Sequence, residues 1–297
     1  MSEAAHEGLP RRLWWILAGL TLAWGFNWTA MKVALAEVGP WTFRTYCLAG
    51  GAAILFAVLR AKATPFSVPR AQWRRLALLA FFNITCWNVL VAYGVSMIPS
   101  GRAAIIAYTM PVWAIPLSMW LLGERMNGRK VAGITLGLTG LALLLAEQVT
   151  RLHAAPVGSL LMAGAAATWA TGTVLQKKFP VSAPVGVFTA WMMLLGAVPI
   201  VLIAAVVELG RQPPISLAAW LAIGYNVIVA FAWAHWAWIK LATSVSVTVF
   251  ALSMLLVPVV GAISGMLFLG ERPTRFEFGA MLLILAALAA VAAPGRR

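Results

Sequence analysis

Aspartate is absent from this chain of 297 residues, and acidic residues of any kind are few. The eight acidic residues are all Glu, and charged residues make up only 10% of the chain. Soluble domains carry about 25% charged residues. Hydrophobic residues account for 62% of the sequence. These proportions exclude an ordinary soluble domain and predict a polytopic membrane protein.

Cysteine, histidine and catalytic motifs are also scarce. Cys47 and Cys86 are the two cysteines, and their spacing fits neither a disulfide framework nor a zinc site. The sequence has three histidines and no HExxH, GxSxG, Walker A or GxGxxG pattern. No nucleophile–base pair can be identified. We therefore expect no enzymatic activity, no metal and no cofactor.

Long apolar runs dominate what is present. About 20 apolar residues cross a bilayer as a helix, and backbone polar groups inside lipid must be satisfied within the segment. Runs of this kind cover residues 13–35, 40–59, 76–97, 101–122, 130–146, 156–176, 184–207, 217–240, 246–269 and 276–293. The sequence therefore predicts an all-α membrane protein with ten transmembrane helices.

The two halves of the chain repeat one another. Residues 121–125 read Leu-Leu-Gly-Glu-Arg, and residues 268–272 read Phe-Leu-Gly-Glu-Arg, 147 residues later. Other residues recur at spacings of 147 or 145: Pro111 and Pro258, Trp24 and Trp169, Lys32 and Lys177. We predict one five-helix repeat over residues 1–150 and a second over residues 151–297. Because five is odd, the second repeat is inverted in the membrane, as in many secondary transporters.

The distribution of Lys and Arg predicts the orientation. With a cytoplasmic N-terminus, 15 of the 22 basic residues fall in cytoplasmic segments and six in outer ones. We therefore expect a multi-pass protein of the inner (plasma) membrane with both termini cytoplasmic. The net charge of +14 is spread over short clusters between apolar runs, so we expect no nucleic-acid partner.

Few polar side chains fall at membrane depth, and each is too costly to face lipid. Asn27 shares a helical face with Trp24, and Asn83 lies four residues before Trp87. Such surfaces suit a ligand with an apolar body and a small polar head, although each amide could equally join two helices. The candidate substrate-binding residues are Trp24, Asn27, Asn83, Trp87, Asn88, Tyr108, Trp169, Tyr225 and His235.

Two basic residues carry alternative interpretations. His235 is either a packing residue or a substrate contact or proton site. Because no carboxylate lies in the middle of a predicted helix, we hypothesise down-gradient transport or exchange without a carboxylate relay. Arg44 lies near the start of the second run, 40–59, which is its outer end in the predicted topology. There it could extend its side chain to the interface or attract a carboxylate.

Two pairs of repeat-related residues are candidate hinges and gates. Pro111 and Pro258 interrupt helical hydrogen bonding, which predicts kinks that are either static or hinges for alternating access. Glu124 and Glu271 each precede an Arg at a predicted helix end. They form either interfacial ion pairs that fix the helix ends or a gating latch.

The segments from Pro111 to Arg125 and from Pro258 to Arg272, with Trp24-Gly25-x-Asn27, carry a resemblance over nearly the whole chain. The sequence resembles the drug/metabolite transporter superfamily, particularly its ten-helix amino-acid and metabolite exporters, and is similar to bacterial aromatic amino-acid exporters. The resemblance implies a basket of helices around a central cavity, with the fifth and tenth helices peripheral, and alternating access.

The function implied by this resemblance is export of amino acids or related metabolites. The Trp, Tyr and Asn residues favour aromatic or apolar amino acids, and the missing carboxylates favour uniport or exchange. Purines, vitamins or organic cations are alternative substrates, and a membrane enzyme or sensor is a less favoured class. The expected partners are a small-molecule substrate and membrane lipid. A monomer is compatible with the sequence.

Overall fold

The computed structural model describes residues 11–123, 126, 128–150, 156–208, 214–244 and 256–292. Every regular element in these ranges is helical. By length and composition, six of their helical stretches can cross a membrane: Pro40–Ala61, Arg70–Met97, Ser100–Leu122, Val157–Lys178, Val185–Val207 and Leu217–Trp238. Val131–Leu143 and Leu256–Leu269 are shorter apolar helices. The predicted all-helical membrane class is confirmed.

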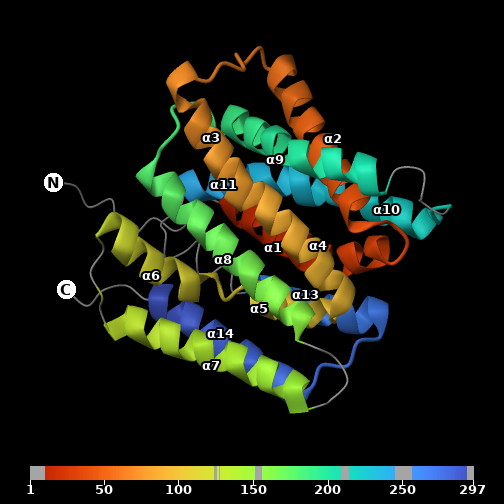
Figure 1. Ribbon diagram of the computed structural model, residues 1–297, viewed down its shortest axis with the longest axis vertical. Helices are drawn as coiled ribbons and strands as arrows, with labels where there is room; N and C mark the ends of the chain where they lie inside the picture. Colours follow the sequence, from red (N-terminus) through yellow and green to blue (C-terminus); the bar gives the residue numbers. More distant parts are fainter. Residues whose placement is uncertain are drawn as a thin grey trace.

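The helices form a bundle of rods joined mostly by short turns (Figure 1). The first half contains α1 (Arg11–Leu35), α2 (Pro40–Ala61), η1 (Arg70–Gln72), α3 (Trp73–Ala80), η2 (Phe81–Cys86), α4 (Trp87–Met97), α5 (Ser100–Ala107), α6 (Met110–Leu122) and α7 (Gly128–Thr150). The second half contains α8 (Val157–Lys178), α9 (Val185–Val207), α10 (Leu217–Tyr225), η3 (Asn226–Trp233), α11 (Ala234–Ser244), α13 (Leu256–Leu269) and α14 (Arg275–Ala292).

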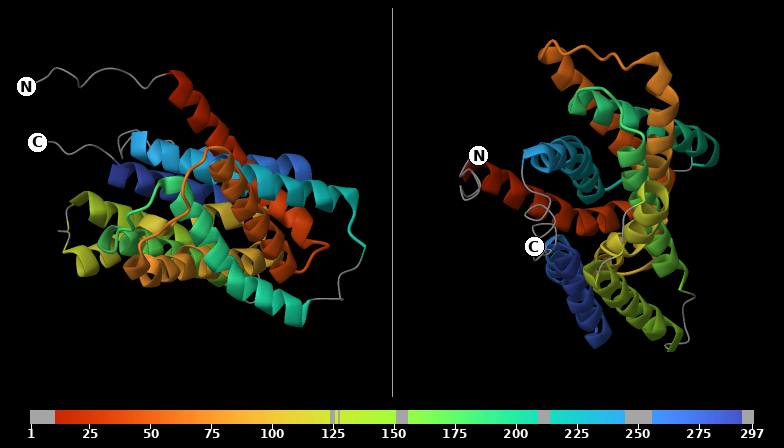
Figure 2. Two further views of the ribbon diagram at one scale, coloured as in Figure 1. Left: turned by 90° about the horizontal axis from the view of Figure 1, so that it is seen from above. Right: turned by 90° about the vertical axis from the view of Figure 1, so that its left-hand side faces the viewer.

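Helices from the two halves pack against each other. α7 and α14 lie side by side at one edge of the bundle, and α1 runs through its middle against α13 (Figures 1 and 2). Small residues permit these close approaches. A Cβ atom at Gly25 would overlap Val260 of α13, and one at Gly140 would press on Ile284 of α14.

Two of the long helices contain a π-helical segment, a wider turn that often occurs at functional sites. η2 separates α3 from α4, and η3 separates α10 from α11. Their first residues, Phe81 and Asn226, are 145 residues apart, as are Trp24 and Trp169. The two halves therefore carry the same irregularity at the same position.

The predicted helix over residues 101–122 is divided in the structure. α5 ends at Ala107, and α6 begins at Met110, which places Pro111 in the first turn of α6 rather than inside one continuous helix. Proline has no N–H group, and its ring clashes with the carbonyl four residues earlier. The Tyr108 N–H accordingly shares the carbonyls of Ala104 and Ile105 as the helix tightens and ends.

The later proline has a similar position in its helix. Pro258 lies in the first turn of α13 as described, and its side chain is buried. Residues 246–255 of the predicted helix over 246–269 lie outside the described residues.

Large apolar side chains cover much of the outer surface. Trp120 is 79% exposed and Val206 is 83% exposed, and Leu202 and Leu282 also point outward. A water-soluble monomer rarely exposes so much apolar surface. A lipid environment accounts for it, in agreement with the composition.

Candidate functional site

A cavity of about 250 Å³ lies between helices of both halves. We call it the central cavity. Its lining comes from α1, α2, α4, α6, α8, η3 and α11 and from the break after α5. The lining residues are Trp24, Asn27, Trp28, Met31, Arg44, Trp87, Asn88, Val91, Tyr108, Met110, Trp169, Ala230, Phe231, His235 and Trp238.

A second cavity of about 390 Å³, which we call the vestibule, adjoins the first. The two share the side chains of Trp24, Trp169, His235 and Trp238. The vestibule continues to the segment 180–183, which joins α8 to α9. Together they form a path from the middle of the bundle to one of its ends.

A wall of aromatic rings lines the junction of these two cavities. The ring centroid of Trp169 lies 4.9 Å from that of Trp87 and 6.5 Å from that of Trp238. On the other side, Trp24 meets His235 edge to face at 5.8 Å. Such rings offer a large apolar surface with little loss of conformational entropy on binding. Trp24 and Trp169, which are repeat-related, therefore both contribute to one aromatic wall.

The local hydrogen bonds of His235 define its tautomer. Nδ1 lies 3.1 Å from the carbonyl oxygen of Ala230, and the ring stacks on Phe231 with centroids 5.3 Å apart. A carbonyl oxygen only accepts, so Nδ1 carries a proton and donates it. In the neutral ring, Nε2 is then an acceptor beside the cavities.

Three asparagines contribute amide groups to the path. The Asn88 amide donates to the carbonyl of Ile84 (2.8 Å), and the Asn83 amide donates to that of Trp169 (3.1 Å). Within the described part of the chain, the side-chain oxygens of Asn27, Asn83 and Asn88 are buried and accept no hydrogen bond. Buried acceptors normally have partners, so three such oxygens beside one path are unusual.

The sequence-predicted binding residues do not all reach the central cavity. Trp24, Asn27, Trp87, Asn88, Tyr108, Trp169 and His235 line it. Asn83 lines the vestibule instead. Tyr225 lines neither of these two cavities. Its hydroxyl donates to the carbonyl of Ala23 (2.7 Å) and so ties α10 to α1.

Arg44 is a cavity residue that sequence reasoning placed elsewhere. The interpretation that its side chain extends to the interface is wrong, because Arg44 is only 2% exposed. Its Nε donates to the carbonyl of Asn88 (3.1 Å), and Nη2 donates to the sulfur of Met31 (3.0 Å). The alternating apolar residues around Arg44 do not indicate that α2 turns it inward. Trp238, also missed, lies one helical turn after His235, a spacing that could have revealed it.

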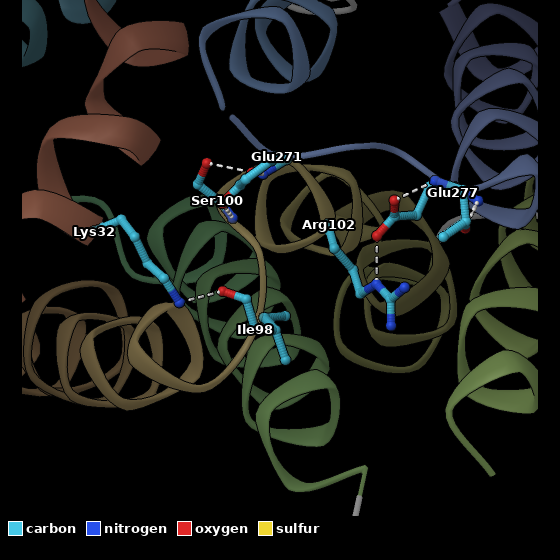
Figure 3. Close-up of polar contacts among 8 residues, drawn as sticks. Lys32, Ile98, Ser100, Arg102, Glu271 and Glu277 are labelled. Atoms are coloured by element: carbon cyan, nitrogen blue, oxygen red, sulfur yellow. Dashed lines mark hydrogen bonds and ion pairs between the residues drawn. The ribbon is translucent and has the colours of Figure 1, made fainter. Parts of the chain in front are cut away.

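The opposite end of the bundle is held by carboxylates that bind helix N-termini. We call it the latch end; its polar residues are Lys32, Glu37, Ser100, Arg102, Glu208, Glu271 and Glu277. Glu271 accepts hydrogen bonds from the Ser100 N–H (2.7 Å), the Ser100 hydroxyl (2.9 Å) and the Gly101 N–H (3.2 Å) (Figure 3). The first N–H groups of a helix lack internal partners and carry partial positive charge. Glu271 therefore caps α5 from the other half of the chain.

Lys32 stabilises the helix that precedes the same turn. Its Nζ donates to the carbonyls of Val95 (2.8 Å), Ser96 (3.2 Å) and Ile98 (2.8 Å), at the C-terminus of α4. Figure 3 shows Lys32 and Glu271 on either side of this turn. A cation at the end of α4 and an anion at the start of α5 both complement the helix dipoles.

A buried ion pair lies beside this turn. Arg102 Nε is 2.6 Å from Glu277 Oε1 (Figure 3). Glu277 also accepts from the Thr274 N–H (2.8 Å), and its own N–H donates to the Thr274 hydroxyl (3.2 Å). This reciprocal pair is a capping box at the start of α14. It holds Glu277 in place for Arg102.

Two further carboxylates join the halves at the same end. Glu208 accepts from the N–H groups of Thr42 (2.8 Å) and Trp41 (3.3 Å) at the start of α2. Glu37 accepts from the N–H (2.7 Å) and hydroxyl (2.6 Å) of Ser216, just before α10. These hydrogen bonds from Ser216 lower the pKa of Glu37 below its ordinary value.

Of the two predicted gate carboxylates, the structure describes Glu271 and not Glu124. Glu271 does not pair with the adjacent Arg272 in the described part of the chain; it caps α5. Glu124 lies outside the described residues. At the end opposite the latch, the Ser182 N–H donates to Gln72 (2.7 Å), and the vestibule lies beside the same segment. Among the described residues, the vestibule thus reaches one end of the bundle, and carboxylates cap helices at the other.

Comparison with known proteins identifies the family. The profile of the EamA-like transporter family matches residues 13–146 and, a second time, residues 156–293. The chain belongs to the EamA-like transporter family. The resemblance to drug/metabolite transporters is therefore confirmed, and this EamA-like protein is a membrane-embedded transporter of a small molecule.

Individual relatives of this EamA-like transporter span its length. It is 24% identical over 269 residues to "Uncharacterized transporter YoaV" of Bacillus subtilis, covering 90% of this chain and 92% of that protein. It is 26% identical over 279 residues to "Probable amino-acid metabolite efflux pump" of Escherichia coli, covering 91% of both. A solved structure, described only as a crystal structure of a protein, matches with a TM-score of 0.67 and 23% identity over 94% of this chain and 97% of that one. This last similarity supports the fold alone.

Proposed function

We propose that this transporter exports amino acids with aromatic or apolar side chains across the bacterial inner membrane. The aromatic wall formed by Trp24, Trp87 and Trp169 is the observation that carries this proposal. The rings suit an apolar side chain, while the side-chain amides of Asn27 and Asn88, which line the same cavity, suit the polar head of an amino acid. Relatives in Escherichia coli and Salmonella typhimurium both carry the name "Probable amino-acid metabolite efflux pump", in agreement with this substrate class.

The size of the path is compatible with such a ligand. Small-molecule sites have volumes of about 300–1,000 Å³. The central cavity of about 250 Å³ lies near the lower limit, and it adjoins the vestibule of about 390 Å³. One amino acid would fill the central cavity after passing through the vestibule.

We propose that ten transmembrane helices form two inverted five-helix repeats, residues 1–150 and 151–297, with both termini cytoplasmic. The two matches of the family profile and the corresponding π-helical segments support the duplication. The positions of Lys and Arg support the orientation. In this topology the vestibule faces the cytoplasm, and the latch end faces the periplasm.

Alternating access would then require the latch end to open and the vestibule to close. Glu271 and its repeat counterpart Glu124 are the proposed gates, and Pro111 and Pro258 the proposed hinges. The break between α5 and α6 beside Pro111 supports a hinge there, because two short helices can change their mutual angle without losing internal hydrogen bonds.

We further propose uniport or exchange as the mode of transport. Among the described residues that line the central cavity and vestibule, none is Asp or Glu, and His235 is the sole histidine. In liposomes, counterflow should proceed without a proton gradient. A flux that follows the proton gradient strictly and disappears in His235→Ala would contradict this mode.

The substrate proposal is tested by counterflow in liposomes with labelled phenylalanine and leucine. Trp24→Ala and Trp87→Ala should each lower flux about tenfold or more, because a buried aromatic contact of this size contributes more than 1.4 kcal/mol. Trp120→Ala is a matched control, since Trp120 is 79% exposed on the outer surface. Flux that is equal in all three variants would remove the cavity from the mechanism. Transport of nucleobases or organic cations, with no amino acid moving, would refute the substrate class.

A further inference from the structure

Arg44 is the most conspicuous charge inside the bundle. It lies one turn inside α2, is 2% exposed and lines the central cavity. No carboxylate lies within ion-pairing distance of it in the described part of the chain. The described Glu side chains at the latch end, Glu37, Glu208, Glu271 and Glu277, all accept hydrogen bonds there instead.

An unpaired buried cation is costly, because desolvation is not offset by a counter-charge. Intramembrane charges of this kind usually belong to substrate or ion pathways. The aromatic neighbours offset only part of the cost: the guanidinium carbon lies 5.1 Å from the ring centroid of Phe43 and 5.9 Å from that of Phe231. The fold therefore retains a charge that needs a partner from outside the chain.

The guanidinium is held in place without being satisfied. Its bonds to the Asn88 carbonyl and the Met31 sulfur use two of the five N–H groups, and the neutral Cys47 thiol beside it is a weak acceptor. The planar fork is thus oriented by neutral groups. Its remaining N–H groups match the geometry of a carboxylate, which binds two parallel donors of Arg.

The rest of the cavity lining favours a negative ligand. Arg44 brings a positive charge, and no lining residue described here brings a negative one. An ammonium group would meet only neutral acceptors, the oxygens of Asn27 and Asn88. A carboxylate would gain a charge-assisted hydrogen bond, which is about twice as strong as a neutral one. Recognition should therefore depend on the carboxylate more than on the ammonium group.

We infer that Arg44 is the carboxylate-binding residue of the central cavity, and that the cavity selects apolar monocarboxylates, with or without an amino group, over the corresponding amines. The inference deepens the proposed function, since it rests on transport through this cavity. It assigns the substrate head group to a residue of α2 and the apolar body to the aromatic wall.

Three ligands that share one phenyl group test the selectivity. L-phenylalanine has both head groups, 3-phenylpropionate lacks the ammonium group, and 2-phenylethylamine lacks the carboxylate. In competition against labelled phenylalanine counterflow, 3-phenylpropionate should compete within about tenfold of phenylalanine, and 2-phenylethylamine should be at least about 10-fold weaker. Equal competition by the amine, with none by the acid, would overturn the inference.

Substitutions of Arg44 separate binding from structure. Arg44→Gln should raise the half-saturating concentration of carboxylates about 10- to 100-fold, Arg44→Lys should raise it less, and Arg60→Gln, on an exposed part of the same helix, should leave it unchanged. Arg44→Met should lose binding and keep or raise the thermal unfolding midpoint, because replacing a buried charge by an apolar side chain is often neutral or stabilising. A purely structural Arg44 would lower that midpoint in every variant and leave the half-saturating concentration unchanged.

Direct binding distinguishes this inference from the substrate proposal. If phenylalanine moves and Arg44→Gln transports it with an unchanged half-saturating concentration, the inference fails and the proposed function stands. If no amino acid moves, but 3-phenylpropionate raises the unfolding midpoint of the wild type and not of Arg44→Gln, the inference stands and the amino-acid assignment fails. If no amino acid moves and the wild-type midpoint is unaffected by 3-phenylpropionate, both fail.

Discussion

Among the described residues, the hydrogen bonds that join the halves at the latch end differ in charge from two that lie at the opposite end. At the latch end, carboxylates from one half of the chain cap helices of the other half, as Glu271 does for α5 and Glu37 does for α10. At the opposite end, Gln72 and Ser182 join two turns, and the Trp191 indole donates to the Phe66 carbonyl. Those bonds are neutral, whereas the bonds at the latch end involve charges.

This difference bears on the alternating access proposed above. Charge-assisted hydrogen bonds are stronger than neutral ones, but they are also readily exchanged for water once an interface opens. In the described residues the charged contacts at the latch end are intact, and the vestibule reaches the opposite end. Weakening the latch end should shift the population toward the other state, and weakening the Gln72 contact should not.

The largest effect should come from breaking the buried ion pair. Arg102→Leu leaves Glu277 buried without its cation, which costs about 3–5 kcal/mol of the free energy of unfolding. The thermal unfolding midpoint measures it. The double variant Arg102→Leu with Glu277→Gln removes the stranded charge and should recover part of the loss. An Arg102→Leu midpoint equal to that of the wild type would show that this pair does not stabilise the latch end.

Removing the cap on α5 should have the next largest effect. Glu271→Gln keeps the shape of the side chain but removes the charge facing the Ser100 and Gly101 N–H groups. The free energy of opening the latch end should fall by about 1–2 kcal/mol, so the equilibrium constant for opening should rise about 5- to 30-fold. Labelling of an introduced cysteine at Ile105, which lies beneath Glu271, measures the opening in a background without Cys47 and Cys86. Gln72→Ala is the control at the other end, and an equal increase there would contradict the comparison.

A glycine beneath the latch offers a smaller, steric perturbation. A Cβ atom at Gly265 would overlap the Glu271 carboxylate and the Ser100 hydroxyl, so Gly265→Ala should displace the cap and lower the unfolding midpoint. Alanine alone favours a helix over glycine by about 1 kcal/mol. Gly164→Ala, whose new Cβ would make an ordinary 3.6 Å contact with Leu90, is the matched control and should be neutral or stabilising. A rise in the midpoint for Gly265→Ala would show that the cap can shift without cost.

The smallest effect should be a pH dependence at Glu37. Because hydrogen bonds from Ser216 lower the pKa of Glu37, this contact stabilises the fold above the ordinary value of 4.5 and loses its contribution as the pH falls through the lowered pKa. The difference in unfolding midpoint between the wild type and Glu37→Gln should therefore shrink with falling pH. A difference that stays constant from neutral pH down to the acid range would rule out this linkage.

Much of the fold follows from the sequence, because few backbone structures can satisfy their polar groups inside lipid. Long apolar runs predicted the helices, and the Leu-Gly-Glu-Arg repeat pointed to the duplication that the family profile also matches. The repeated glycine has a local reason: Gly123 and Gly270 adopt positive φ angles of 67° and 64°, which end their helices. Helical spacing also linked Trp24 with Asn27 and Asn83 with Trp87, four residues that line the cavities.

Other features depend on long-range packing and escaped prediction. Whether Arg44 faces lipid, water or the interior is decided by α4 and η3, not by the residues next to it. The caps from Glu37 and Glu208 are made across the halves, so no local motif reveals them. The capping box Thr274-x-x-Glu277 was also not predicted, although its spacing is visible in the sequence and matches the start of α14.

The paired π-helical segments have a consequence for how the cavity wall is aligned. Each residue added to a helix rotates everything after it by about 100° about the helix axis. The extra residue of η2 thus sets the direction in which Trp87 and Asn88 point, and that of η3 does the same for His235 and Trp238. Deleting one residue from either segment would turn the cavity-lining side chains that follow it toward neighbouring helices. The residue types would be unchanged, but their directions would be wrong. The register of these two helices is, in that sense, part of the binding site.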